Sequence, residues 1–260
     1  MRTALVGGSS KGLGLACARA LAAENYRVVL CARNRDVLEN AARDICTAEG
    51  TEVIAIRCDL SKRESLATLK DELTKRNLQV DILINNVGGP PPGVVTELSE
   101  AEWEYGLDLL FRSTVRLYNM FLPGMRERKW GRIVNILSTT AVEPVSTLAV
   151  SSVLRAAIAS YAKLVAWEVA RDGVIVNSVM PGGFRTARAE ALALDLARRR
   201  SVTVERIRNE KTADIPIQRL LEPEELGHLM TFLVSDEAAA IVGALIPIDG
   251  GVLKSLQGCV

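Results

Sequence analysis

Short apolar runs alternate with amphipathic segments along almost the whole chain. Runs rich in Val, Ile and Leu predict strands at 3–8, 27–32, 52–59, 81–86, 132–138, 174–182 and 245–250. Between them, apolar positions recur every three or four residues, as at 13–25 and 35–49, which predicts helices. Strands that are apolar on both faces are typical of a parallel sheet covered on both sides. The pattern therefore predicts a doubly wound α/β fold, an about seven-stranded parallel sheet with helices on both faces.

The organisation of the chain indicates a single domain over residues 1–260, because no linker, repeat or low-complexity tract interrupts the alternation. One segment stands out. Residues 185–214 are polar, arginine-rich and helical in pattern. Two interpretations stay open for this segment: a solvated surface helix, or a mobile lid over a substrate pocket.

Composition and charge narrow the classes of function. Lys and Arg (32) nearly balance Asp and Glu (31), so the net charge of about +1 gives no reason to expect binding to nucleic acid or membrane lipid. The amino terminus carries no cationic leader and no segment approaches the roughly 18 apolar residues of a membrane span, which favours a cytoplasmic protein. The five cysteines show no metal-binding spacing, so we expect buried thiols and no metal site.

A glycine-rich turn follows the first predicted strand. Gly8, Gly12 and Gly14 have the spacing GxxxGxG and lie just before the first predicted helix. Glycines let the backbone turn tightly and approach a pyrophosphate, and the helix amino terminus offers free N–H groups to that anion. The turn therefore predicts a dinucleotide site.

The end of the second predicted strand indicates which dinucleotide binds. An acidic residue there would hold the adenosine ribose hydroxyls and favour NAD. The chain has Ala32 and Arg33 instead. A guanidinium can pair with a 2′-phosphate, and Lys11 in the glycine turn adds a second cation, so NADP(H) is favoured over NAD(H). The alternative is that Arg33 and Lys11 are only solvated.

Six motifs, in their order and spacing, resemble the short-chain dehydrogenase/reductase family and most of all bacterial 3-oxoacyl-carrier-protein reductases. They are GGSSKGLG at 7–14, CDL at 58–60, NNVG at 85–88, GRIVNILS at 131–138, VNSVMPGGFRT at 176–186 and IPIDGG at 246–251. The resemblance implies a Rossmann-type fold, a nicotinamide cofactor and a small-molecule substrate. It also implies a homo-oligomer, a tetramer or a dimer, packed through the helices after the fourth and fifth strands.

The resemblance also implies which residues contact the cofactor. Asp59 and Leu60 would lie near the adenine, and Asn86 and Gly88 would line the ribose. Pro181, Gly182 and Thr186 would lie near the carboxamide. The glycine turn would contribute Gly8, Ser10, Lys11, Gly12, Leu13 and Gly14.

The catalytic positions of the family are where this chain departs from the resemblance. The family uses a serine, a tyrosine, a lysine four residues later and an asparagine. Here the serine is Ser138, but the tyrosine position is Ser151, the lysine position is Arg155 and the asparagine position is Leu110. Tyr161 follows Ser151 by ten residues, roughly 15 Å along a helix, so we expect it to pack between helices.

The replacements change the available chemistry. A serine hydroxyl lacks the acidity of a phenol, so Ser151 can serve only as a hydrogen-bonding group. Arginine stays protonated, so Arg155 can hold a ribose or a phosphate, or stabilise a developing alkoxide together with Ser138. Ser138, Ser151 and Arg155 are therefore the catalytic candidates. Losing a general acid typically costs ~10²–10⁴-fold in rate.

Three other polar residues, Glu143, Asp108 and His228, and the tryptophans have less direct relations to the site. Glu143 could reach the pocket mouth or be a solvated loop carboxylate, and Asp108 could face the cavity of Leu110. His228 is expected to be structural or at the surface. The three tryptophans, Trp167 among them, are expected to pack helices.

Three functions remain open from the sequence. The first is an NADP(H)-dependent oxidoreductase of a carbonyl or alcohol with an atypical active site. The second is a dinucleotide-binding pseudoenzyme, a sensor or a partner subunit, suggested by the loss of three catalytic positions. The third keeps the cofactor bound for an internal redox cycle, as in an epimerase.

Overall fold

Seven parallel strands form the sheet of the computed structural model, which describes residues 1–255. Along the chain they are β1 (Thr3–Gly7), β2 (Arg27–Ala32), β3 (Val53–Arg57), β4 (Ile82–Asn85), β5 (Gly131–Ile136), β6 (Val174–Pro181) and β7 (Leu245–Ile248). Across the sheet their order is β3-β2-β1-β4-β5-β6-β7. The predicted doubly wound, Rossmann-type fold is confirmed. Most strands end one or two residues early, because the glycines and polar residues that follow form turns.

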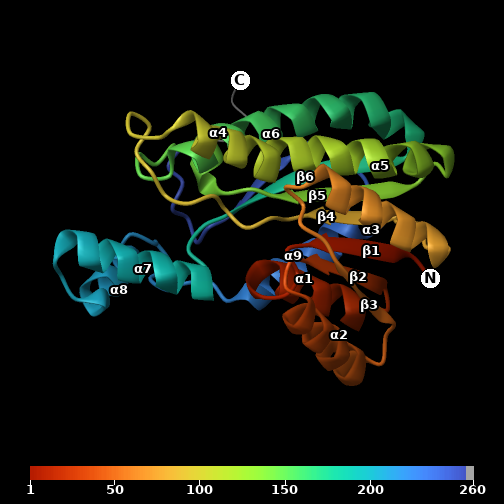
Figure 1. The fold of residues 1–260 in the computed structure, drawn as a ribbon, viewed down its shortest axis with the longest axis horizontal. Coiled ribbons are helices and arrows are strands. Elements are labelled where there is room, and N and C mark those ends of the chain that lie inside the picture. Colours follow the sequence, from red (N-terminus) through yellow and green to blue (C-terminus); the bar gives the residue numbers. More distant parts are fainter. Residues whose placement is uncertain (256–260) are drawn as a thin grey trace.

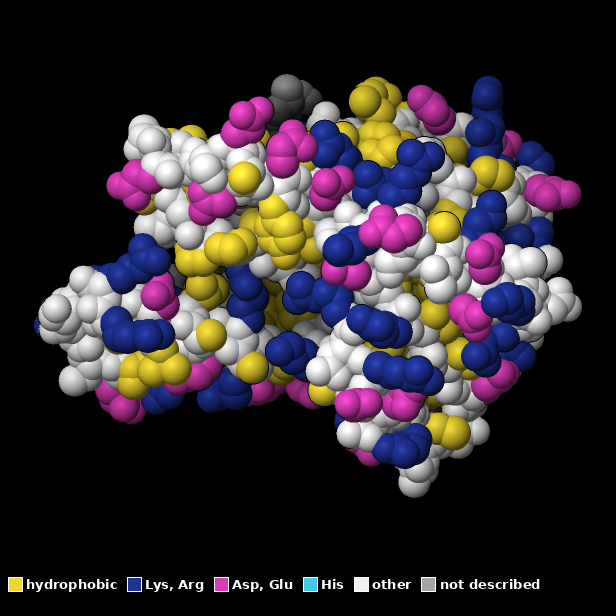
Figure 2. All heavy atoms as spheres, in the orientation of Figure 1, with side chains coloured by type: hydrophobic (Ala, Val, Ile, Leu, Met, Phe, Trp, Pro, Cys, Tyr) yellow, Lys and Arg dark blue, Asp and Glu magenta, His cyan; other side chains and the backbone are white. Residues whose placement is uncertain are grey.

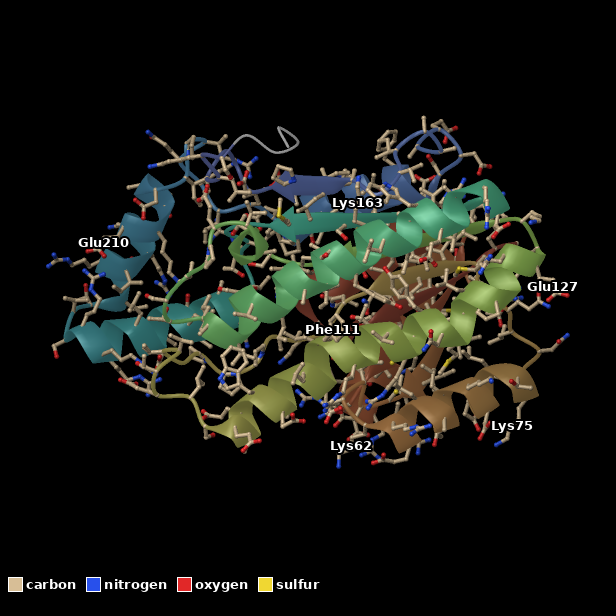
Figure 3. The ribbon with its side chains drawn as sticks, turned by 90° about the horizontal axis from the view of Figure 1, so that it is seen from above. Lys62, Lys75, Phe111, Glu127, Lys163 and Glu210 are labelled. Atoms are coloured by element: carbon tan, nitrogen blue, oxygen red, sulfur yellow. The ribbon has the colours of Figure 1, made fainter. Side chains whose placement is uncertain are left out.

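Helices cover both faces of this sheet (Figure 1). One face is covered by α1 (Gly12–Ala23), α2 (Arg35–Glu49) and α9 (Pro223–Val234), and the other by α3 (Arg63–Lys75), α5 (Ser113–Glu127) and α6 (Ala149–Val169). The strands supply both cores, since alternate side chains point to opposite faces. On β2, Leu30 joins the core under α1 and α9, whereas Val29 joins the core under α5 and α6. Figure 3 shows α5 and α6 side by side.

The strand order reverses between β1 and β4, and this reversal positions the site. Leu5 of β1 pairs with Val29 of β2 on one side and with Leu83 of β4 on the other. In open parallel sheets, ligands bind beyond the carboxyl ends of the strands at such a switch point. The glycine turn after β1 and Asn86 after β4 both lie there.

A wide turn interrupts the long helix that leads into α5. After α4 (Glu100–Gly106), the segment η1 (Leu107–Arg112) forms a π-helix. Such π-bulges are rare and occur often at functional sites. Leu110, at the family's asparagine position, is fully buried in η1.

The segment 185–214 forms an arm of two helices, α7 (Ala187–Arg200) and α8 (Val204–Ala213), that projects from the body (Figure 1). Its own small core contains Ala193, Ala197 and Ile207. Surface ion pairs use much of its charge, for example Arg200 with Glu210. In Figure 2, Lys and Arg side chains border the hollow between the arm and the body. The helices carry solvated charged side chains, in line with one of the two interpretations, and a lid role stays a prediction.

The cysteine prediction is correct for three of the four described thiols. Cys17, Cys31 and Cys58 are buried, but Cys46 is exposed because it lies on the outer side of α2. Cys259 lies outside the described residues.

One described helix reaches the length and apolarity of a membrane span, contrary to the sequence-based expectation. It consists of α6 and the short continuation η3 (Ala170–Asp172), and half of its most apolar window is buried. The buried half packs on the sheet, and core helices of this kind meet the same criterion.

Candidate active site

The turn after β1 can be built only from glycine at its closest points. Gly8 and Gly12 have φ angles of 56° and 60°, in the left-handed region. A Cβ on Gly14 would lie 2.5 Å from the Gly8 carbonyl oxygen. The Asn86 side chain donates to the Gly7 carbonyl at 3.0 Å, which ties the turn to the end of β4. The structure thus brings together Gly8, Gly14 and Asn86, and their binding of a cofactor stays a prediction.

This turn leaves the start of α1 open to an anion. Lys11 is at the N-cap position of α1, and its side chain makes no capping hydrogen bond. The first N–H groups of the helix therefore remain free to bind an anionic ligand. The backbone carries the features of a pyrophosphate cradle.

Ser9 is a structural residue of the turn that the sequence interpretation missed. Its hydroxyl is buried, donates to the Val6 carbonyl at 2.8 Å and accepts from the Cys31 N–H at 2.9 Å. These bonds fix the turn against the end of β2. Nothing in the sequence separates Ser9 from its neighbour Ser10, because their roles depend on which side chain points inward.

A group of cations lies beyond the end of β2. Arg33 and Lys11 are both exposed, so either can reach a ligand or remain solvated. Arg57, at the end of β3, donates from Nε to the Arg33 carbonyl at 3.1 Å. It is a second guanidinium beside Arg33 that the sequence interpretation missed, because the neighbourhood follows from the β2–β3 register.

Asp59 and Leu60 lie next to this corner of the sheet. The Asp59 carboxylate accepts from the Ser61 N–H at 3.1 Å and the Ser61 hydroxyl at 2.7 Å. Leu60 is buried, and its Cδ1 would lie 3.2 Å from a Cβ on Gly7. The β3–α3 segment therefore borders the glycine turn.

The segment after β6 faces the same turn from the other side. Gly182 donates to the Ile248 carbonyl at 3.0 Å, and a Cβ on it would lie 2.6 Å from that of Asp249. Thr186 caps α7 by accepting from the Ala189 N–H at 3.2 Å. Its methyl group would lie 3.9 Å from a Cβ on Gly12. Thr186 thus lies beside the glycine turn, and Pro181 ends β6 five residues before it, paired with Ile248 of β7.

Arg155 connects the candidate catalytic residues. Its Nε donates to the Ser151 hydroxyl at 3.1 Å, one turn earlier on α6. Its Nη1 donates to the Ile136 and Leu137 carbonyls, each at 2.9 Å, just before Ser138. Ser138 accepts from the Thr140 N–H at 3.2 Å, at the start of the short helix η2 (Thr139–Ala141), so its own proton stays available.

The Arg155 guanidinium is buried without a carboxylate partner among the described residues. Its side chain lies against the end of β5, and the residue is only 8% exposed. Burial, and then repulsion from Arg188, lower the pKa of Arg155 to about 10. The group is still a cation at neutral pH, fixed beside Ser138.

Leu110 and Tyr161 are both packed against neighbouring side chains. The Leu110 carbonyl accepts from the Thr114 hydroxyl at 2.7 Å within the π-helical segment, and its side chain packs in the core. Tyr161 packs against Phe111 and Tyr118, with ring centroids 5.9 and 5.4 Å away. Figure 3 labels Phe111 at this contact between the helices. Tyr161 is therefore a packing residue, as predicted.

A buried polar cluster below the site was not predicted. Asn85 donates to Asn135 at 2.9 Å and to Thr114 at 3.0 Å, and Asn135 bonds to the Tyr118 hydroxyl at 2.8 Å. Asn135 also donates to the Ser178 hydroxyl at 3.2 Å. These bonds hold β4, β5, β6 and α5 together where the site residues begin.

The remaining polar candidates have other roles. The Asp108 carboxylate pairs with Arg116 at 3.2 Å, so it belongs to a partly exposed ion pair. Glu143 is not a free loop carboxylate, since it accepts from the N–H groups of Lys254 and Ser255 at 3.0 and 3.2 Å. These bonds lower the pKa of Glu143. His228 is exposed on α9, as expected.

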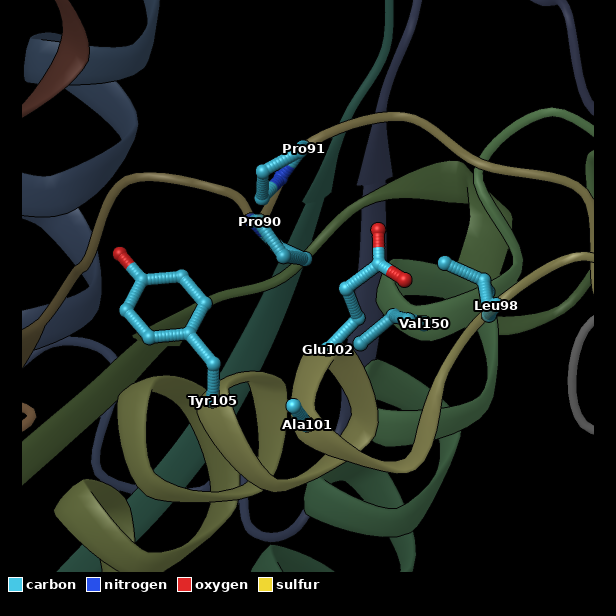
Figure 4. A pocket seen from close by; sticks show the side chains of 7 residues that line it. All are labelled: Pro90, Pro91, Leu98, Ala101, Glu102, Tyr105 and Val150. Carbon is cyan, nitrogen blue, oxygen red and sulfur yellow. The ribbon is translucent and has the colours of Figure 1, made fainter.

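A small cavity of about 130 Å³ lies at the start of α6 (Figure 4). It is lined by Pro90, Pro91, Leu98, Ala101, Glu102, Tyr105 and Val150. Val150 directly precedes Ser151. The post-β4 loop reaches this region through Gly93, whose N–H donates to the Thr147 carbonyl at 2.9 Å. The cavity is mostly apolar and could hold a hydrocarbon part of a substrate.

A family profile described as enoyl-(acyl carrier protein) reductase matches residues 8–253. The chain belongs to the short-chain dehydrogenase/reductase family. Relatives align with nearly the whole length of the chain. A Streptomyces coelicolor protein named as a ketoacyl reductase is 32% identical over 252 residues, covering 95% of each chain.

Solved structures of this family superpose closely on the chain. An L-sorbose reductase from Gluconobacter frateurii, complexed with NADPH and L-sorbose, has a TM-score of 0.93 and 32% identity, covering 98% of this chain and 97% of its own. An actinorhodin polyketide ketoreductase with NADPH has a TM-score of 0.93 and 30% identity, covering 98% of each chain. Both contain NADPH, in agreement with the predicted cofactor preference.

Proposed function

We propose that this short-chain dehydrogenase/reductase is an NADP(H)-dependent oxidoreductase of a small carbonyl or alcohol substrate, with an active site that lacks the family Tyr, Lys and Asn. The observation that carries the proposal is the Arg155 arrangement. The Arg155 cation donates to the carbonyl of Leu137, the residue before Ser138, and to the Ser151 hydroxyl, near an open dinucleotide cradle. The NADPH-bound relatives support the cofactor part.

The residues present fit NADP(H). A Cβ on Gly8 or Gly14 would collide with the Asn86 side chain or the Gly8 carbonyl and so distort the cradle, whose role is to let a pyrophosphate approach α1. Arg33, with Arg57 next to it, would pair with the 2′-phosphate. Asp59 and Leu60 would border the adenine, Asn86 and Gly88 the ribose, and Pro181, Gly182 and Thr186 the carboxamide. Ser10, Lys11, Gly12 and Leu13 would complete the phosphate side.

The protein's part in the reaction follows from its donors. Bound NADPH would supply the hydride. The Ser138 hydroxyl would donate to the substrate oxygen, and the charge of Arg155 would stabilise the alkoxide that develops there. Ser151 would hold the guanidinium in place through its bond to Nε. The alkoxide then takes its proton from water, since neither Ser151 nor Arg155 is an acid near neutral pH.

The test is a hydride-transfer assay over a panel of ketones and alcohols, with NADPH oxidation or NADP⁺ reduction followed for the wild type, Ser138→Ala and Arg155→Ala. Activity of the wild type that both variants reduce supports the proposal. Wild-type rates equal to those of both variants contradict it. Calorimetric NADPH binding without any turnover would favour the alternative, a dinucleotide-binding pseudoenzyme acting as sensor or partner subunit.

The remaining parts of the proposal concern the whole protein. It would be a single domain of residues 1–260, in the cytoplasm, with 185–214 as the lid of the substrate pocket. It would form a homo-oligomer, a tetramer or a dimer. The exposed apolar residues Val153, Leu164 and Trp167 on α6 support packing of copies through this helix.

A further inference from the structure

Two arginines face the candidate active site without an acidic partner. On and around the arm, Arg185, Arg199, Arg200, Arg206 and Arg208 form ion pairs with nearby carboxylates. Within residues 1–255, no such ion pair involves Arg155 or Arg188. Arg155 is a buried cation without a counter-ion, which is costly, whereas Arg188 is an exposed cation without a carboxylate partner, so an anion would stabilise the pair mainly through Arg155.

The two guanidinium groups approach the site from different elements. Arg155 comes from α6 and is buried at the end of β5. Arg188 comes from the first turn of α7 and reaches across to the post-β4 loop, where its Nη2 donates to the Pro90 carbonyl at 3.0 Å. Its Nη2 would lie 2.7 Å from a Cβ on Gly89, so the guanidinium lies directly on this backbone.

Geometry brings the two groups to one region: Pro90, which accepts from Arg188, lines a cavity together with Val150, and Val150 directly precedes the Ser151 that accepts from Arg155. Their pKa values agree with this placement. Repulsion from Arg188 is a cause, after burial, of the lowered pKa of Arg155. Burial also lowers the pKa of Arg188, although much of its side chain still reaches solvent. An anionic group between them would remove this repulsion while remaining accessible from the cleft.

Pro90 connects Arg188 with the apolar cavity. Pro90 presents its carbonyl to Arg188, and its ring lines the cavity of about 130 Å³ (Figure 4). An apolar cavity of roughly 150 Å³ can hold benzene. The one carboxylate at the cavity wall, Glu102, already accepts from the Ser99 N–H and hydroxyl at 2.9 and 2.7 Å. It is therefore occupied as a helix cap.

We propose that Arg155 and Arg188 form a binding site for a carboxylate, and that the substrate is a small oxo acid or hydroxy acid with an apolar group about the size of a ring. This inference rests on the proposed oxidoreductase function for the reacting carbon. The carboxylate binds between the two guanidinium groups, the apolar group enters the cavity beside Pro90, and the reacting oxygen lies near Ser138. A phosphate of the dinucleotide has the same anionic chemistry, and the experiment separates these two sources.

The binding test uses benzoate and benzamide, which have nearly the same shape but differ in charge. Each is titrated calorimetrically into the full-length protein, with and without saturating NADP⁺. The variants are Arg188→Met and, as a matched control on the exposed side of the same helix, Arg198→Met. We expect benzoate to bind at least tenfold more tightly than benzamide, and Arg188→Met to remove this difference while Arg198→Met keeps it. Equal binding of the two probes would overturn the inference.

A second arm identifies the source of the anion. If Arg188→Met weakens NADPH binding tenfold or more and leaves benzoate unchanged, the site holds a cofactor phosphate and the inference is wrong. For turnover, oxo acids are compared with their methyl esters. We expect kcat/KM to favour each acid at least tenfold, and Arg188→Met to raise KM for the acid more than for the ester.

These results also separate the inference from the proposed function. Turnover of neutral ketones with equal binding of benzoate and benzamide keeps the function and removes the carboxylate site. Selective benzoate binding without any turnover keeps the anion site and removes the oxidoreductase.

Discussion

Arg155 differs from the family's lysine in more than size. Lysine presents a compact charge that can be directed at a ribose. Here the guanidinium donates hydrogen bonds from Nε to Ser151 and from Nη1 to the carbonyls of Ile136 and Leu137. The cation is therefore fixed relative to Ser138. The sequence could predict the charge, but the bonds to Ile136 and Leu137 depend on how α6 packs on the sheet.

The pH dependence of catalysis should reflect the protonation of Arg155. The pKa of Arg155 is lowered to about 10, so the charge is present below that pH and is lost as pH rises through it. We expect kcat/KM for carbonyl reduction to be flat between pH 6 and 9 and to fall as pH rises through 10. Arg155→Met should lower kcat/KM by about 10²–10³-fold, the usual effect of removing an oxyanion donor. Arg155→Lys, which keeps a positive charge, should recover part of the lost kcat/KM. A titration midpoint between pH 6 and 9 in the wild type would contradict this role.

Arg33 should decide the choice of dinucleotide. A hydrogen bond to a charged group contributes about 1.5–3 kcal/mol, so Arg33→Ala should raise the Kd of NADPH by roughly 10- to 100-fold. The Kd of NADH should hardly change. Arg35→Ala is the control, because Arg35 is exposed and pairs with Glu39. An equal loss for both dinucleotides in calorimetric titrations would show that Arg33 does not read the 2′-phosphate.

At the scale of elements, the sequence predicts best where the backbone itself is the functional group. The GxxxGxG spacing was sufficient to locate the turn between β1 and α1. It could not reveal that Asn86 holds this turn from β4 or that Ser9 holds it from β2, since both contacts join segments distant in the chain. The position of Arg57 beside Arg33 and the Asn85–Asn135 cluster could not be predicted for the same reason.

Alanine substitutions of two glycines near the cradle should differ in their effect on stability. In Gly14→Ala the new Cβ meets the Gly8 carbonyl oxygen at 2.5 Å, so we expect a loss of about 1–3 kcal/mol in the free energy of unfolding, as for overpacking. NADPH binding should be lost as well. Gly88→Ala adds a Cβ with nothing within 4 Å and should unfold like the wild type. Urea denaturation and calorimetry measure both. Wild-type stability of Gly14→Ala would mean that the turn is looser than described.

The segment after β7 should detach when Glu143 loses its charge. The pKa of this carboxyl is lowered by the Lys254 and Ser255 N–H groups, so its contribution is present above its usual value of 4.5 and is lost as pH falls through the lowered folded-state pKa. At neutral pH, Glu143→Ala should speed hydrogen exchange of these two amides about tenfold. The control is Glu97→Ala, since Glu97 is an exposed carboxylate in the turn before α4. Unchanged exchange in Glu143→Ala would show that other contacts hold the segment.

For the whole molecule, the alternation of strands and helices was sufficient to predict the sheet and its two helical layers. It was not sufficient for the surfaces. Trp167 was expected to pack between helices, but it is 68% exposed on α6. A helix pattern indicates which residues are apolar, not whether a neighbour in the same chain covers them.

The exposed face of α6 should be covered in an oligomer. Trp167→Glu, or Leu164→Glu next to it, places a charge in that contact and should shift the protein to a smaller species in sedimentation velocity runs. Phe232→Glu on α9 is the control, since Phe232 is also exposed but lies on the opposite face of the sheet. A wild-type protein that is already monomeric at high micromolar concentration would contradict oligomerisation through α6.

The most direct test of the central claim follows the hydride itself. NADPH carrying deuterium at both C4 positions of the nicotinamide is incubated with a panel of oxo acids and ketones, and products are examined by mass spectrometry for deuterium on the carbinol carbon. The account predicts labelled alcohol with the wild type, and at least tenfold less with Ser138→Ala or Arg155→Met under saturating cofactor. Tight NADPH binding with no label in any product above the enzyme-free blank would contradict it.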